Sequence, residues 1–154
     1  MLFFIAVTTL TIGCFGRSDI EDTDTAAGKY SHADFDQTKS LADSLYSYMQ
    51  FRDAYKLYLQ LLDSKEVETD NEKRLSVLYR LSNASELSGH LTEETKWLHL
   101  LLDLATQTGN NYYRSLAQIS MGENVFYEGN HEKGIQYVSE AWLSVPIHTT
   151  TSRE

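Results

Sequence analysis

The chain has 154 residues, of which 42% are hydrophobic, and it carries a net charge of −9. This length is enough for one domain with its own core. The negative charge argues against binding to nucleic acid, because nucleic-acid binders usually present a basic patch. A single proline and eight glycines are too few turn-forming residues for a β-sandwich or β-barrel. The composition therefore favours an all-α domain.

The first segment of the chain, MLFFIAVTTLTIG, carries no charge and is apolar apart from its threonines. It is too short to span a bilayer, which takes about 20 residues. Its length and character are those of the apolar core of a secretory signal. We therefore interpret residues 1–13 as a signal peptide and expect an exported protein.

The stretch LTIGC ends at Cys14, the only cysteine of the chain. It resembles the lipobox of bacterial lipoproteins, in which a small residue precedes a cysteine that is lipidated and becomes the new N-terminus. Gly13 matches the small residue, and the resemblance implies that Cys14 is the lipidation site. A lone cysteine cannot form an internal disulfide, and two or more acyl chains anchor a protein stably to a membrane. The alternative is an ordinary cysteine near a signal peptide.

Residues 14–34 contain many acids and few large apolar side chains. Such a segment cannot bury enough surface to fold, so we interpret it as an acidic tether between the membrane and the domain. The triplets DTA at 24–26 and DSL at 43–45 resemble the short O-glycosylation signal of Bacteroidetes periplasmic proteins. These features predict a lipid-anchored protein on the periplasmic side of a bacterial membrane or on the cell surface.

The rest of the chain shows a period of forty residues, because residues forty positions apart mostly share their character. The matching sets are Met49, Gly89 and Gly129; Leu41, Leu81 and Met121; Tyr58, Leu98 and Val138; and Leu61, Leu101 and Ala141. Within each unit, apolar residues recur at helical spacing. The pattern predicts three pairs of helices, at about 35–48 and 51–63, 70–87 and 92–107, and 111–127 and 131–144.

Residues that begin or end helices lie at the expected boundaries. Gly129 is placed to end the helix at 111–127, because glycine takes the left-handed conformation easily, and Asn130 is a good N-cap for the next helix. Thr69 and Glu72 have the spacing of a capping box for the helix at 70–87. Pro146 would stop the last helix.

In the helix at 131–144 the inner side is predicted to carry five residues: Ile135, Val138, Ala141, Trp142 and Val145.

The third unit resembles a tetratricopeptide repeat, a pattern of 34 residues. The small residues, glycine and proline of that pattern fall here on Gly122, Gly129, Gly134, Ala141 and Pro146. The first unit matches at Ala42, Phe51, Ala54 and Tyr58, whereas in the second unit Ser82 and Gly89 fit but Glu94 occupies a small position.

The resemblance covers residues 35–146 and leaves 147–154 as a tail. It implies a solenoid of about three antiparallel helical hairpins. The alternative is an ordinary helical bundle with accidental periodicity.

The sequence carries no Walker loop, dinucleotide fingerprint, nucleophile elbow or zinc-binding motif. Glu93 and Glu94 form an acidic pair at a predicted helix start, where acids interact favourably with the helix dipole. We therefore expect no enzymatic activity, no cofactor and no metal.

In tetratricopeptide repeats the first helix of each hairpin lines a concave face. The register of the family places nine residues there: Lys39, Asp43, Tyr46, Tyr79, Asn83, Glu86, Glu123, Phe126 and Tyr127. Tyrosine is enriched at protein interfaces. We predict that a partner binds to Tyr46, Tyr79, Asn83, Glu86, Glu123 and Tyr127. Packing of several of these residues against neighbouring helices is an equal alternative.

The sequence thus predicts a lipid-anchored, tetratricopeptide-like scaffold that binds a protein or peptide. The alternative is the N-terminal sensing module of a longer bacterial signal-transduction regulator, a layout that Bacteroidetes regulators resemble.

Overall fold

The computed structural model describes residues 34–144, and all regular structure in this range is helical. The all-α prediction is therefore confirmed for this part of the chain. The helices are α1 (Phe35–Ser47), α2 (Phe51–Leu62), α3 (Lys65–Thr69), α4 (Asn71–Ser88), α5 (Leu91–Thr108), α6 (Asn111–Tyr127) and α7 (His131–Ser144). The predicted signal peptide, Cys14, the tether up to residue 33, Val145, Pro146 and the tail lie outside the described residues.

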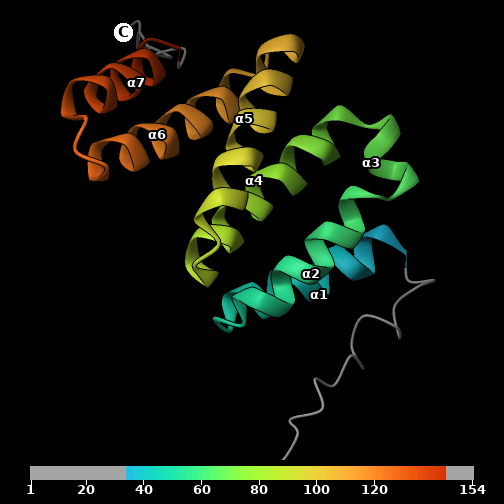
Figure 1. The fold of residues 1–154 in the computed structure, drawn as a ribbon. Helices are drawn as coiled ribbons and strands as arrows, with labels where there is room; N and C mark the ends of the chain where they lie inside the picture. The colour runs from blue at the N-terminus through green and yellow to red at the C-terminus, as the bar shows by residue number, and fades with distance from the viewer. Residues whose placement is uncertain (1–33, 145–154) are drawn as a thin grey trace, which may run out of the picture.

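The helices pack largely in chain order. Helix α2 packs against both α1 and α4, α5 packs against both α4 and α6, and α7 packs mainly against α6. Figure 1 shows α1 and α2 at one end of the molecule, α6 and α7 at the other, and α4 and α5 between them. Helices α2 and α5 thus each lie between two packing partners, whereas α7 has one main packing partner.

The predicted helix boundaries agree with the observed ones to within a residue or two, but the short helix α3 was not predicted. Ser64 begins it by accepting a hydrogen bond from the backbone N–H of Val67, and the Val67 side chain is buried. Helix α3 lengthens the connection between α2 and α4. Helices α4 and α5, at 18 residues each, lengthen the second unit. Both features contribute residues to the forty-residue spacing of the units.

The prediction of a capping box at Thr69 is wrong, because Thr69 belongs to the last turn of α3. The N-cap of α4 is Asp70, whose Oδ1 accepts hydrogen bonds from the backbone N–H groups of Glu72 (2.9 Å) and Lys73 (3.1 Å). An aspartate carboxylate is as good an N-cap as a serine or threonine hydroxyl. The helix therefore begins one residue later than predicted.

The turns between the helices of each pair repeat with the period of the sequence. Met49, Gly89 and Gly129 all have left-handed backbones, with φ values of 61°, 82° and 93°. This conformation costs a non-glycine residue about 1–2 kcal/mol. Met49 nevertheless adopts the same turn conformation as the two glycines. Asn130 caps α7 as predicted, through a hydrogen bond from the N–H of Lys133.

The periodic apolar positions form much of the core. Tyr58, Leu61, Leu81, Leu98, Leu101, Met121 and Ala141 are all buried. The prediction for α7 is partly wrong: Ala141 is buried, but Ile135 is 61% exposed and Trp142 is 74% exposed. The physical reason is that α6 is the main helix packed against α7, so only one side of α7 is covered.

Helices α6 and α7 approach each other most closely at two glycines. A Cβ atom added to Gly134 would lie 2.8 Å from the carbonyl oxygen of Gly122 and 2.9 Å from Cβ of Phe126. A Cβ atom added to Gly122 would lie 3.0 Å from the carbonyl oxygen of Gly134. The two backbones are therefore in contact, and the absence of a side chain at Gly134 permits this close packing.

This contact predicts that Gly134→Ala destabilises the domain. Glycine-to-alanine changes inside a helix normally stabilise it by about 0.5–1 kcal/mol, but here the added methyl group must push the backbones apart, at a cost of about 1–3 kcal/mol. Thermal and urea unfolding of the variant would measure the difference.

The matched control is Gln136→Ala, at an exposed position of the same helix, which should change stability by less than about 0.5 kcal/mol. A Gly134→Ala variant more stable than the wild type would contradict the close contact.

Candidate functional site

An apolar hollow of about 300 Å³ lies on the surface of the α6–α7 pair. It is lined by Gly122, Glu123, Phe126, Tyr127, Gly134, Ile135, Val138 and Ser139. Two of these residues are the glycines at the helix contact, which contribute no side chain to fill the space. Because Phe126 and Ile135 flank the hollow and are both substantially exposed, it offers an apolar surface to a ligand.

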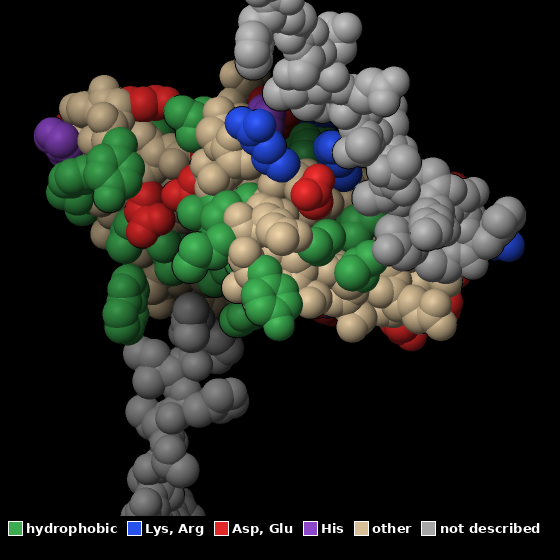
Figure 2. All heavy atoms as spheres, turned by 90° about the horizontal axis from the view of Figure 1, so that it is seen from below, with side chains coloured by type: hydrophobic (Ala, Val, Ile, Leu, Met, Phe, Trp, Pro, Cys, Tyr) green, Lys and Arg blue, Asp and Glu red, His purple; other side chains and the backbone are tan. Residues whose placement is uncertain are grey.

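An acidic groove of about 370 Å³ adjoins this hollow. It is lined by Glu86 of α4, by Leu91, Glu94 and Thr95 of α5, and by Asn124, Tyr127 and Glu128 at the end of α6. Tyr127, which is 86% exposed, borders both the groove and the apolar hollow. Figure 2 shows acidic and hydrophobic side chains next to one another on the half of the molecule that carries α6 and α7.

Glu94 is the most unusual residue of the groove. Glutamate side chains are rarely buried in proteins, yet the side chain of Glu94 is only 2% exposed. Its Oε1 accepts a hydrogen bond from Nδ2 of Asn124 at 2.7 Å. Burial raises the pKa of Glu94, the bond from Asn124 opposes this rise, and the negative charges of Glu86 and Glu123 add to it. Glu86 and Glu123 are therefore each close enough to repel the carboxylate of Glu94.

The prediction that Glu93 and Glu94 lie at a helix start is confirmed, because both belong to the first turn of α5. Only Glu93 is exposed there, whereas Glu94 is buried. The forty-residue register could have revealed this. Glu94 occupies the position held by Ala54 in α2 and by Gly134 in α7, and both of those residues are buried. A carboxylate in this register is forced into the interface between helices.

A second polar cluster joins α1, α2 and α4. Asp43 accepts hydrogen bonds from Lys39 Nζ and from the Tyr58 hydroxyl, each at 2.7 Å, and Arg80 Nε lies 3.4 Å from its Oδ1. Burial acts to raise the pKa of Asp43, but the bonds from Lys39 and Tyr58 and the charges of Lys39 and Arg80 outweigh burial and lower it. These side chains satisfy one another, so the cluster holds helices together.

The structure divides five of the six predicted partner-binding residues into two groups and leaves Asn83 outside both. Tyr46 and Tyr79 are half-buried and pack on neighbouring rings, with centroid distances of 5.3 Å to Phe51 and 6.2 Å to Tyr113. For these two, the alternative of packing against neighbouring helices is the one observed.

The second group is exposed. Glu86, Glu123 and Tyr127 are exposed and line the acidic groove or the apolar hollow. Asn83 is half-buried and lines neither. The groove residues that the sequence prediction missed are Leu91, Glu94, Thr95, Asn124 and Glu128.

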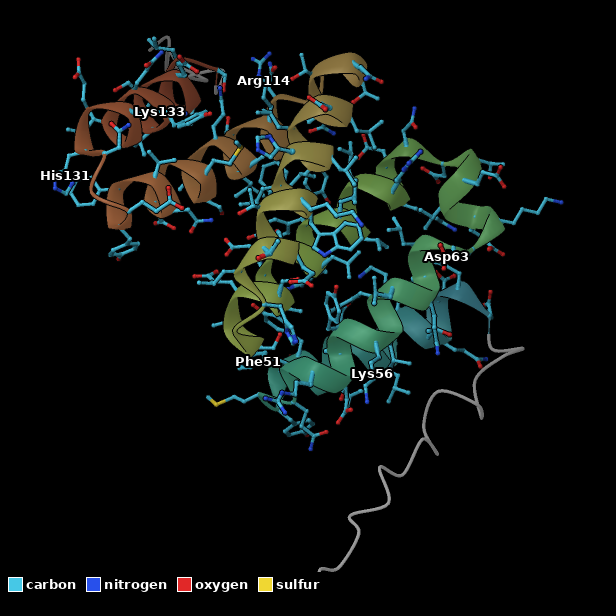
Figure 3. The ribbon with its side chains drawn as sticks, in the orientation of Figure 1. Phe51, Lys56, Asp63, Arg114, His131 and Lys133 are labelled. Carbon is cyan, nitrogen blue, oxygen red and sulfur yellow. The ribbon has the colours of Figure 1, made fainter. Side chains whose placement is uncertain are left out.

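The histidines at the helix turns lie against aromatic rings. His90 stacks on Tyr55 with a centroid distance of 5.9 Å, and His131 lies 4.3 Å from Phe126. Figure 3 places His131 in the first turn of α7, beside the end of α6.

Among residues 34–144, no three His, Cys, Asp or Glu side chains are grouped so that they could hold a metal ion. No helix in the described part of the chain is long and apolar enough to cross a membrane.

Comparison with protein-family models, with curated proteins and with solved structures finds no match to this chain.

The burial of Glu94 predicts that Glu94→Gln stabilises the domain at neutral pH. Since the pKa of Glu94 is raised in the folded state, its contribution to stability is present below the unfolded pKa and is lost as pH rises through the folded pKa. Glutamine keeps an acceptor for Asn124 without the charge. We expect a gain on the order of 1 kcal/mol at neutral pH that disappears near pH 3.5, about one unit below the ordinary glutamate pKa.

Urea unfolding at both pH values would measure this difference. Glu93→Gln, one residue away and exposed, is the control and should change stability by less than about 0.5 kcal/mol at either pH. A loss of stability at neutral pH in Glu94→Gln alone would show that the charged carboxylate is stabilising.

Proposed function

We propose that this chain is a lipid-anchored, tetratricopeptide-like helical scaffold on the periplasmic side or surface of a bacterial cell, where it binds a protein or peptide partner. The observation that carries the binding role is the joined surface of the apolar hollow and the acidic groove. Exposed aromatic side chains such as Tyr127 make broad contacts at low entropic cost, as interface residues do. No catalytic role is assigned to any residue.

Three features of the described helices support the repeat architecture within this proposal. The left-handed turns at Met49, Gly89 and Gly129 recur every forty residues. Helices α2 and α5 each pack between two others. Small buried residues lie at Ala42 and Ala54 in the first pair and at Gly122 and Gly134 in the third. A pair of helices cannot bury its apolar faces alone, so repeated pairs are stable when they stack.

A second candidate function is a sensing module within a longer signal-transduction regulator. The exposed side of α7 favours it, because Ile135, Trp142 and Leu143 are 61%, 74% and 88% exposed. Solenoid proteins cover such a surface with a capping element. In this candidate, a further part of the regulator would pack on α7.

The anchoring part of the proposal predicts an acylated Cys14. Mass spectrometry of the protein extracted from the membrane fraction of its native cell should find acyl chains on an N-terminal Cys14, with residues 1–13 removed. Cys14→Ser should release the protein from that fraction. An intact Met1 with an unmodified Cys14 would contradict the anchor.

The binding part predicts that a photocrosslinking amino acid at Tyr127 captures one defined partner in the native cell. The same group at Lys56 should not, because Lys56 lies on α2 at the opposite end of the molecule (Figure 3). Its side chain is 64% exposed, so the control position is accessible as well. Capture of the same proteins from both positions, or of none from Tyr127, would contradict a binding site at this surface.

A further inference from the structure

We propose that the partner segment carries a lysine or arginine close to a large apolar residue, with the cation in the acidic groove and the apolar side chain in the apolar hollow. This inference rests on the binding role proposed above and adds the chemistry of the partner. It follows from the carboxylates that line the acidic groove, from the second carboxylate oxygen of Glu94, and from the way the acidic groove adjoins the apolar hollow.

The acidic groove has negative charge that the described helices leave unbalanced. Glu86, Glu94 and Glu128 line it, and none of its lining residues is lysine or arginine. The negative charge of nearby Glu123 also acts to raise the pKa of Glu94. The ion pairs found among residues 34–144 are made by Asp43 and Asp53, away from the groove. A cation bound here would offset the repulsion that Glu86 and Glu123 exert on Glu94.

Glu94 provides a hydrogen-bond acceptor that is held in place but only half used. Its Oε1 accepts the bond from Asn124, whereas its Oε2 accepts none within residues 34–144. This oxygen is not one of the fully buried, unpaired side-chain atoms of the described residues, and because Glu94 lines the acidic groove, a donor in the groove can reach it. The ammonium group of lysine and the guanidinium group of arginine are such donors, and their bonds to carboxylate are stronger than neutral ones.

The walls of both hollows suit the remaining parts of such a ligand. The aliphatic stem of lysine or arginine packs well on apolar surface, which Leu91 and Tyr127 supply beside the carboxylates. The ring of Tyr127 can also attract the cation itself. On the other side of Tyr127, the exposed Phe126 and Ile135 offer the apolar hollow to a neighbouring side chain.

Other occupants fit these observations less well. An acidic peptide or a nucleic acid would be repelled by the carboxylates. A wholly apolar segment would leave Oε2 of Glu94 without a donor. A metal ion lacks a set of three converging ligands among the described residues.

The test is selection of a phage-displayed random peptide library on the full chain, followed by fluorescence anisotropy of the enriched peptides as synthetic probes. We expect enriched peptides to contain lysine or arginine within one or two positions of a large aliphatic or aromatic residue. Glu94→Gln, Glu86→Gln and Ile135→Ser should each weaken their binding, by about tenfold for Glu94→Gln, which corresponds to about one charge-assisted hydrogen bond. Glu132→Gln, an exposed acid of α7 outside both hollows, should leave binding unchanged.

Enriched peptides without a basic residue, or binding that survives Glu94→Gln and Glu86→Gln, would overturn this inference. So would the enrichment of no peptide at all. In each of these cases a partner captured from Tyr127 in the crosslinking experiment would leave the proposed binding function standing, so the two failures can be distinguished.

Discussion

The contact between the backbones of α6 and α7 at Gly122 and Gly134 is the constraint on which the candidate site depends. Because neither residue has a side chain, the two helix backbones touch there. Phe126 and Ile135 are thereby left to flank an open hollow. Any side chain at Gly134 would move α7 and change the shape of that hollow, so packing and site geometry are set by the same two residues.

The second helix pair departs from this arrangement at one position. Where α2 has Ala54 and α7 has Gly134, α5 has Glu94, and the forty-residue register buries all three. The carboxylate reaches Asn124 of the next helix and borders the acidic groove. A residue that is poor for packing is thus placed where it can serve recognition, as is common when a local rule of stability is broken at a functional site.

Much of the helical layout could be predicted from the sequence, because it depends on local signals. Glycine at 89 and 129 and asparagine at 130 end or begin helices through their own backbones and side chains. The exposure of Ile135 and Trp142 could not be predicted in this way, since it depends on which helix faces α7 and not on the spacing of apolar residues. The role of Glu94 was hidden for a similar reason, because acids at a helix start are normally exposed.

We propose above all that a basic and apolar peptide segment binds across the junction of α4, α5, α6 and α7. The most direct measurement is an NMR titration, in which a basic peptide enriched by the phage selection is added to the isotope-labelled full chain. We expect chemical-shift changes to concentrate on residues of the acidic groove and the apolar hollow, with the strongest changes around Glu94 and Tyr127. Changes concentrated on α1 and α2, or spread evenly over the molecule, would contradict it.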